Sequence, residues 1–240
     1  MLTNDPHPHD ISTRVVSPRY ADTALSWQVL RRYRARWSPT VTIDLCPIFL
    51  GGVMKGSGNR PPATVAAKGA WMMGDLERNG RLFDYPILPP PANFFTEVAR
   101  AVISAQRLLV AAQQSGADDA QIDTLITALT DSLWTDAARR DASDELTIDA
   151  ELLAACCAQS GLDATALLAA TSTPEVKQQL VANTELALQA GVFGSPSFLV
   201  QAAPGTREQI LIFGSDRFEQ LCHELDLPWD GPTGVRRSAL

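Results

Sequence analysis

Residues 191–200 carry the types and order of residues that are most suggestive of chemistry. Their sequence, GVFGSPSFLV, joins the end of an apolar helix pattern to a run of strand-forming residues. Pro196 has no N–H to give to a sheet ladder, so it suits the start of a strand. A cis bond between Ser195 and Pro196 would make a tight turn that directs backbone polar groups outward, where a ligand could bind them. The local sequence alone leaves this turn and an ordinary trans turn equally open.

The cysteines give no sign of a dithiol or metal site. They form no C-x-x-C pair and have no metal-ligand spacing. Two of them are adjacent inside an apolar helical pattern, where neighbouring side chains point about 100° apart and cannot grip one metal well. We therefore predict reduced, buried thiols and no metal site. The four are Cys46, Cys156, Cys157 and Cys222.

The composition is that of a globular chain with a substantial core. The chain has 240 residues, of which 45% are hydrophobic, and a formal net charge of -7. This charge argues against nucleic acid and anionic membranes as partners. No apolar run reaches the roughly 18 residues of a membrane span, and the first residues lack the basic start and apolar centre of a secretion signal. We expect the cytoplasm as the default compartment.

The elements that must position residues 191–200 follow from hydrophobic periodicity. Strand patterns occupy residues 11–16, 40–50, 197–201 and 209–213. Helix patterns occupy residues 24–37, 63–79, 93–115, 120–140, 149–159, 164–170, 174–190 and 217–225. Residues 51–62 are dense in glycine, proline and asparagine, so we predict an irregular segment there.

The order of these elements is β-α-β, then a long helical block, then α-β-β-α. One sheet domain interrupted by helices explains this order, which is the thioredoxin topology with an expanded crossover. We therefore predict the α/β class, with a thioredoxin-like domain made of residues 1–60 and 172–240. Residues 61–171 form an all-helical insertion subdomain in this prediction.

Five motifs occur in the order typical of one enzyme family. They are FLGGVMKGSGNRPP at 49–62, KGAWMMGDL at 68–76, TPEVK at 173–177, GVFGSP at 191–196 and FGSDR at 213–217. The chain thus resembles kappa-class glutathione transferases and the related 2-hydroxychromene-2-carboxylate isomerases over residues 17–232. More distant relatives are the periplasmic disulfide oxidoreductases with the DsbA-type fold, whose C-x-x-C this chain lacks.

The resemblance implies that Ser17 is the catalytic residue. The family places its essential serine before a proline, between the first strand and the first helix, and Ser17-Pro18 match this motif. A hydroxyl that donates to the glutathione sulfur favours the thiolate and lowers the pKa of the thiol. Taken alone, Ser17 would be a helix cap. The segment differs from the family in having Arg14 in place of an aspartate and extra residues within 19–26.

The resemblance also implies a set of glutathione-binding residues that includes Pro18. Asn59 matches an asparagine near bound glutathione that could bond the cysteinyl or the glycyl part, and Lys68 matches a lysine that meets the glycyl carboxylate. Taken alone, the first would be a turn residue and the second a solvated helix residue. Four further matches complete the set: Ser195 and Pro196 would hold the cysteinyl part through the backbone, and Ser215 and Asp216 the γ-glutamyl end. The last pair would otherwise be a simple helix cap.

The activity implied by the resemblance is a kappa-like glutathione S-transferase with glutathione as cofactor. The thiolate would attack a small hydrophobic electrophile such as an aryl halide, an activated alkene or a peroxide, and the family implies a homodimer. A glutathione-dependent isomerase in a biosynthetic or aromatic-degradation pathway is one alternative, and a catalytically degenerate glutathione-binding protein is another. Organellar relatives and the terminal Ser-Ala-Leu, similar to a peroxisomal address, keep mitochondrion and peroxisome open as compartments.

Overall fold

A computed structural model of the chain describes residues 11–16, 21–38, 41–201 and 209–235, without the side chains of 11–16 and 201. Within these residues the strands form one four-stranded sheet in the order β2-β1-β3-β4. The central strand β1 (Ile11–Val16) pairs parallel with β2 (Val41–Cys46) and antiparallel with β3 (Ser197–Gln201). The last strand, β4 (Gln209–Phe213), pairs antiparallel with β3.

The register brings three chain segments to one end of the sheet. Val16, the last residue of β1, lies opposite Cys46 on one side and Ser197 on the other. Ser197 in turn lies opposite Phe213, the last residue of β4. The end of β1, the turn before β3 and the end of β4 therefore meet at the same end of the sheet.

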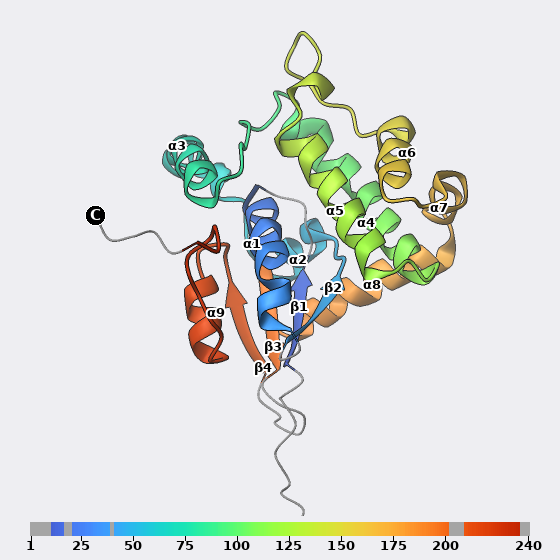
Figure 1. The fold of residues 1–240 in the computed structure, drawn as a ribbon. Helices are drawn as coiled ribbons and strands as arrows, with labels where there is room; N and C mark the ends of the chain where they lie inside the picture. The colour runs from blue at the N-terminus through green and yellow to red at the C-terminus, as the bar shows by residue number, and fades with distance from the viewer. Residues whose placement is uncertain (1–10, 17–20, 39–40, 202–208, 236–240) are drawn as a thin grey trace, which may run out of the picture.

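Helices cover both faces of the sheet. Successive residues of a strand point to opposite faces, and β3 shows this clearly: Phe198 packs into one hydrophobic cluster and Leu199 into another. The helices α1 (Ala21–Trp37) and α9 (Phe218–Glu224) contribute to the first cluster. The helices α2 (Leu50–Ser57) and α8 (Pro174–Gln189) lie over the opposite face (Figure 1).

The prediction of an irregular segment at residues 51–62 is wrong. Most of it is α2, followed by a short 3-10 turn, Pro62–Thr64. Glycine weakens an isolated helix, but here it lets α2 approach α8. A Cβ on Gly56 would lie 2.7 Å from Leu188 Cδ1, and one on Gly52 would lie 3.1 Å from Thr184 Cγ2. Packing between the two helices thus overrides the local preference.

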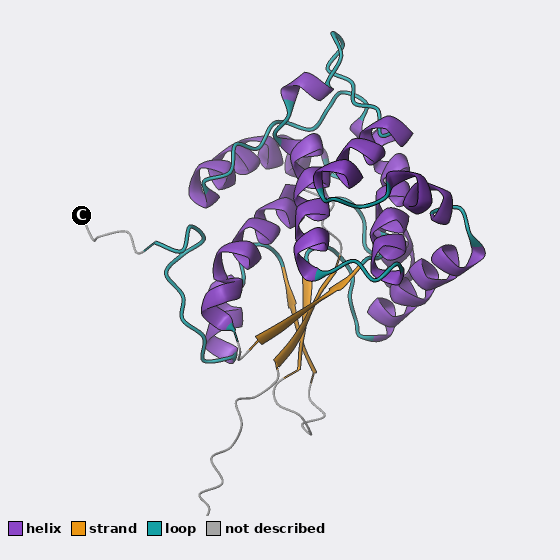
Figure 2. Cartoon of the chain, turned by 45° about the vertical axis from the view of Figure 1, so that its right-hand side comes forward, coloured by secondary structure: helices purple, strands orange, loops and turns teal. Residues whose placement is uncertain are grey.

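The helices of the central block gather above and beside one end of the sheet (Figure 2). The predicted helix at 120–140 ends earlier, at Trp134, and the predicted helix at 93–115 opens with a π-helical turn, Phe94–Val98. The observed helices are α3 (Ala66–Phe83), α4 (Ala99–Gln114), α5 (Asp119–Trp134), a 3-10 turn (Ala137–Arg139), α6 (Ala150–Gln159) and α7 (Ala164–Ala170).

The hydrophobic core is continuous from the sheet into the helical block. A single cluster joins Trp27 of α1 and Phe198 of β3 to Leu108 of α4 and Leu129 of α5. The indole Nε1 of Trp27 donates a hydrogen bond to Thr127 Oγ1 at 3.1 Å, which adds a polar link between α1 and α5. Helix α1 is thus fixed from both sides. No helix in the described ranges combines the length and the apolarity that crossing a membrane requires.

The C-terminal segment is anchored on α1 through Tyr33. Its buried side chain donates a hydrogen bond to Gly231 O at 2.8 Å and accepts one from Asp230 N at 2.8 Å. Its ring stacks on Trp229 with 5.0 Å between centroids. A phenylalanine in its place would keep the packing and lose both hydrogen bonds.

We predict that Tyr33→Phe lowers the free energy of unfolding by about 1–3 kcal/mol, because the backbone groups of Asp230 and Gly231 lose their partner. Urea unfolding followed by circular dichroism measures this change. An unfolding midpoint equal to that of the wild type would show that the anchor contributes nothing.

Candidate active site

The loop at residues 193–197 connects α8 to β3 and contains a cis bond between Ser195 and Pro196. The local sequence leaves the cis and trans turns equally open, and the structure has the cis form. Two hydrogen bonds fix the loop against the sheet. Ser197 Oγ donates to Gly194 O at 2.8 Å, and Gly214 N, just after β4, donates to Pro196 O at 3.1 Å.

The first turn of α1 contacts this loop directly. Thr23 Oγ1 and Ser195 Oγ lie 3.0 Å apart and share a hydrogen bond, although the two residues are far apart in the sequence. Thr23 is only 1% exposed, so this contact is shielded from water. The first turn of α1 therefore lies beside the cis-proline loop, and the partial positive charge of a helix N-terminus favours an anion there.

Asn59 holds the loop from the opposite side. Its Nδ2 donates to Phe193 O at 2.8 Å, and its Oδ1 accepts from Arg60 N at 2.8 Å. Gly58, with φ +77°, ends α2 in the left-handed conformation and turns Asn59 toward the loop. Asn59 is thus more than a turn residue, because it connects the end of α2 to the residues before Pro196.

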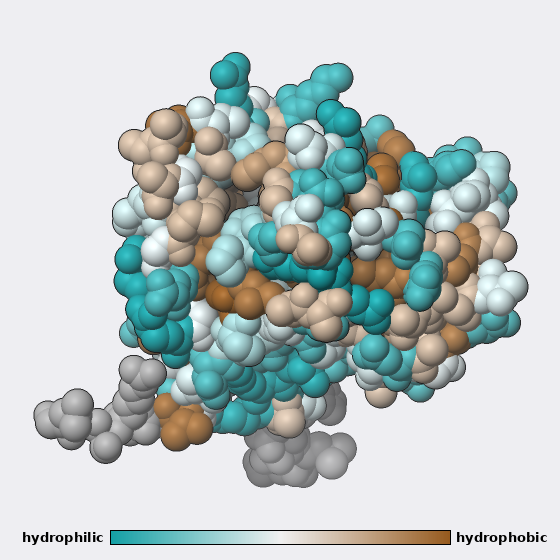
Figure 3. Space-filling model, turned by 90° about the horizontal axis from the view of Figure 1, so that it is seen from above, coloured by the Kyte–Doolittle hydropathy of each residue, from teal (hydrophilic) through white to brown (hydrophobic). Residues whose placement is uncertain are grey.

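A cavity of about 320 Å³ opens beside this loop. Three of the predicted site residues line it: Asn59, Lys68 and Ser195. Seen from above, the surface has a hollow bordered largely by hydrophobic residues (Figure 3). Eight of the 21 lining residues are aromatic or methionine: Met54, Met72, Met73, Phe94, Phe95, Trp134, Phe193 and Phe213.

The other predicted residues lie near the cavity or outside the described ranges. Ser215 is buried and Asp216 is exposed, in the turn after β4 that bonds to Pro196 through Gly214. Neither lines the cavity. The expectation that Ser215 stands at a helix N-terminus is wrong, because α9 begins only at Phe218 and Arg217 precedes it. Ser17 and Pro18 fall in residues 17–20, which the structure does not describe.

The site also contains residues that the sequence patterns did not single out. Asp22 and Thr23 belong to the first turn of α1, whereas the apolar periodicity starts the helix at residue 24. An acidic residue in a first helical turn is itself a start signal, and it could have moved the predicted boundary. Asp22 lines the cavity, together with Lys68 and Arg60.

Asp22 has an unusual electrostatic environment. The pKa of its carboxyl is raised to about 6, chiefly by loss of hydration and then by the negative charges of Asp75 and Asp216. The side chain nevertheless remains open to solvent at the cavity wall. It therefore titrates close to neutral pH while keeping a path to water.

The thiols play no part in this site. All four cysteines are free, and three are buried, whereas Cys46 is half-buried, which corrects the expectation that every thiol is buried. Burial raises the pKa of Cys222 to about 12 and that of Cys157 to about 11. These two groups stay protonated at neutral pH and are poor nucleophiles.

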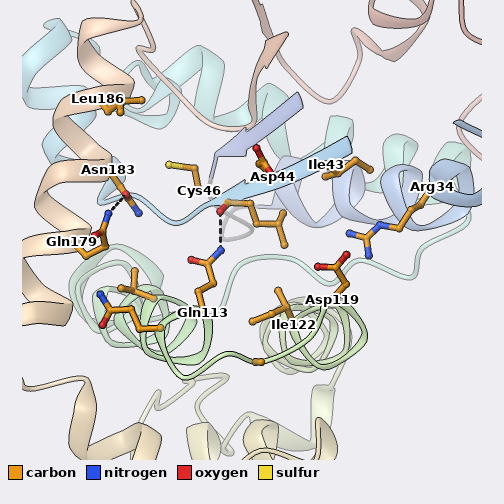
Figure 4. A pocket seen from close by; sticks show the side chains of 14 residues that line it. Arg34, Ile43, Asp44, Cys46, Gln113, Asp119, Ile122, Gln179, Asn183 and Leu186 are labelled. Carbon is orange, nitrogen blue, oxygen red and sulfur yellow. Dashed lines mark hydrogen bonds between the residues drawn. The ribbon is translucent and has the colours of Figure 1, made fainter. Parts of the chain in front are cut away.

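A second cavity, of about 580 Å³, runs along the outer edge of β2 and contains none of the predicted site residues (Figure 4). Two amide side chains there donate hydrogen bonds to backbone carbonyl groups in the edge strand β2 or just after it. Gln113 Nε2 donates to Leu45 O at 2.8 Å, and Asn183 Nδ2 donates to Pro47 O at 2.9 Å. These contacts satisfy backbone groups that an edge strand otherwise leaves open.

Comparison with known proteins agrees with this architecture. A family model described as DSBA-like thioredoxin domain matches residues 23–226. A solved 2-hydroxychromene-2-carboxylate isomerase superposes with a TM-score of 0.69 at 18% identity, covering 90% of this chain and 94% of the other. A putative protein disulfide isomerase from Nitrosomonas europaea gives a TM-score of 0.63 at 16% identity, covering 90% and 96%. The chain belongs to the DSBA-like thioredoxin domain family, and the predicted fold class is confirmed.

Within this family the curated relatives are of one kind. The chain is 31% identical over 210 residues to glutathione S-transferase kappa 1 of Homo sapiens, covering 87% of each protein. The identity to glutathione S-transferase kappa 1 of Rattus norvegicus is 30% over the same length and coverage. The predicted resemblance to the kappa class is therefore confirmed.

The contact between α1 and the cis-proline loop is testable. We predict that Thr23→Val lowers the free energy of unfolding by about 1 kcal/mol, because a buried hydrogen bond is lost. Without this bond the cis-proline loop is less fixed and must be ordered when glutathione binds. Glutathione should therefore bind about two- to fivefold more weakly. Urea unfolding and isothermal titration calorimetry measure the two effects.

Thr127→Val is the matched control, because it removes a threonine hydroxyl that bonds α1 at Trp27, away from the loop. It should cost stability without changing glutathione affinity. Equal affinities for the two variants would argue against a role of the Thr23 contact in binding.

Proposed function

We propose that this chain is a kappa-like glutathione S-transferase that activates the glutathione thiol for attack on a small apolar electrophile. The observation that carries the proposal is the cis-proline loop beside an apolar cavity that Asn59 and Lys68 also line. Relatives named glutathione S-transferase kappa 1 share 30–31% identity over most of the chain. A solved disulfide reductase of similar fold is described with GSH, which supports glutathione as a ligand of this architecture.

Glutathione would lie along the loop with its three parts in different surroundings. The cysteinyl backbone would pair with Ser195 and Pro196 in the manner of an added strand. The ammonium of Lys68, which is exposed at the cavity wall, would meet the glycyl carboxylate. Ser215 and Asp216 would hold the γ-glutamyl end, since Gly214 bonds their turn to Pro196.

Ser17 is the proposed catalytic residue, on the strength of the Ser17-Pro18 motif. A hydroxyl hydrogen bond stabilises a thiolate relative to a thiol and so lowers its pKa. The N-terminal end of α1 adds positive potential on the same side, as the contact between Thr23 and Ser195 indicates. The aromatic and methionine side chains of the cavity would receive the apolar electrophile.

We also propose a homodimer. Several large apolar side chains of α3 and its start are exposed, including Trp71 at 62%, Val65 at 50% and Leu82 at 45%. Phe95 is exposed at 61% on the neighbouring π-helical turn. Exposed apolar side chains gathered in one region mark interaction surfaces.

The transferase proposal predicts glutathione binding and a Ser17-dependent thiolate. Isothermal titration calorimetry should show binding at millimolar glutathione or below, and thiolate absorbance of bound glutathione should persist at neutral pH. Ser17→Ala should lose that absorbance and at least tenfold in turnover, because the hydroxyl no longer stabilises the charged sulfur. Absence of binding at millimolar glutathione contradicts the proposal.

The same experiment separates the alternatives. A stable conjugate of glutathione with 1-chloro-2,4-dinitrobenzene supports transfer. Recovery of unmodified glutathione with an isomerised product supports the isomerase, and binding without a Ser17-dependent thiolate supports the degenerate binding protein.

The dimer has its own measurement. Light scattering coupled to size-exclusion chromatography should give twice the chain mass of 25.9 kDa. Trp71→Glu should shift the mass toward that of the single chain, because it places a charge in the apolar surface. A wild-type protein with the mass of one chain would contradict the homodimer.

A further inference from the structure

Asp22 lies where a carboxylate either takes part in the reaction as a proton acceptor or opposes it by disfavouring the thiolate. It lies in the first turn of α1 and lines the same cavity as Ser195, Asn59 and Lys68. An adjoining pocket of about 390 Å³, lined mainly by α3 residues that include Trp71 and Asp75, is lined by Asp22 as well. Asp22 thus lies on the wall of both pockets.

The position of the glutathione sulfur follows from the proposed binding mode. If the cysteinyl part lies on Ser195 and Pro196, its sulfur faces the N-terminal turn of α1, because Thr23 of that turn touches Ser195 at 3.0 Å. Asp22 is the neighbour of Thr23 and lies on the side that faces the cavity. Among the described residues, Asp22 is the acidic residue of that first turn.

We propose that Asp22 is a catalytic residue that accepts the proton of the glutathione thiol when glutathione binds, so that the thiolate is present before the sulfur attacks the electrophile. The inference rests on the proposed transferase function and adds a general base to it. Its open side lets the carboxyl pass the proton to water after the reaction.

The charged groups around Asp22 suit this role. Asp75 on α3 and Asp216 before α9 face it with negative charge, although each lies close to an arginine: Arg78 contacts Asp75, and Arg217 contacts Asp216. Lys68 and Arg60 are cations of the same cavity wall. No ion pair to Asp22 occurs within the described residues.

The raised pKa of Asp22 also favours proton transfer from a thiol to its carboxylate. A pKa of about 6 leaves most of the carboxyl ionised at neutral pH and makes it a stronger base than an ordinary aspartate. An ionised carboxylate beside a thiolate disfavours the thiolate. A carboxyl that has taken the thiol proton is neutral and does not have this effect.

The transfer step balances with an aryl chloride as the electrophile. When glutathione binds, the S–H bond breaks and its proton moves to a carboxylate oxygen of Asp22, which leaves the thiolate. The sulfur electron pair then forms a bond to the ring carbon. The C–Cl bond then breaks, and chloride leaves with the electron pair. Asp22 releases the proton to water, and the products are the conjugate, chloride and a proton.

The test measures kcat/KM of the full chain with glutathione and 1-chloro-2,4-dinitrobenzene between pH 5 and 8. In the wild type kcat/KM should fall as the pH drops below about 6, because protonation removes the base. Asp22→Asn should lower kcat/KM about 100-fold at pH 7.5 and abolish that acidic limb. Asp22→Glu, which keeps a carboxylate, should restore part of the rate and the limb.

Asp75→Asn serves as the electrostatic control. It removes a charge that raises the pKa of Asp22, so the acidic limb should move to lower pH with the rate at pH 7.5 unchanged. Circular dichroism shows that each variant is folded, and calorimetry gives its glutathione affinity.

Two outcomes overturn the inference. An Asp22→Asn variant that matches or exceeds the wild-type kcat/KM would show that the carboxylate only opposed the thiolate. An acidic limb that persists in that variant would assign the titration to another group. A wild-type protein that fails to bind glutathione overturns the proposed function itself, which calorimetry distinguishes from a failure of Asp22 alone.

Discussion

The site depends on the fixing of residues 193–197 by groups that are remote in the sequence. Thr23 from α1 bonds Ser195, Asn59 from the end of α2 bonds Phe193, and Gly214 from the end of β4 bonds Pro196. Each hydrogen bond contributes only about 1 kcal/mol to stability. Together they bring three segments of the chain to one loop, so the wall that would receive a ligand is already shaped before binding.

Helix α1 connects this loop to the hydrophobic core. Its buried face is shared between the sheet and the helical block, and Trp27 bonds α5 while Tyr33 holds the C-terminal segment. The cavity wall comes from α3, the π-helical turn and Trp134 of α5. Because α1 packs against both α3 and α5, the apolar wall and the polar loop keep a fixed relation to each other.

Sequence patterns predicted the elements that obey local rules and missed those set by packing. The strands Ile11–Val16, Ser197–Gln201 and Gln209–Phe213 have the predicted bounds, since alternation and β-branched residues define them. Helix α2 was missed because the close contact of Gly56 with Leu188 is invisible in local propensity. Motifs indicated Asn59 and Ser195 near the cavity, but the contact of Thr23 with Ser195 is a tertiary pairing that no local pattern encodes.

The charge at the start of α1 sets a constraint on any chemistry at this loop. The N-terminus of a helix carries about half a positive charge, which by itself favours a thiolate placed against Ser195. The ionised carboxylate of Asp22, on the same turn, carries a full negative charge that opposes that contribution. A site in which the N-terminus of α1 stabilises the thiolate must therefore neutralise Asp22 at the moment the thiolate forms. Transfer of the thiol proton to Asp22 is the arrangement that does so without another cation, and it turns an opposing charge into part of the reaction.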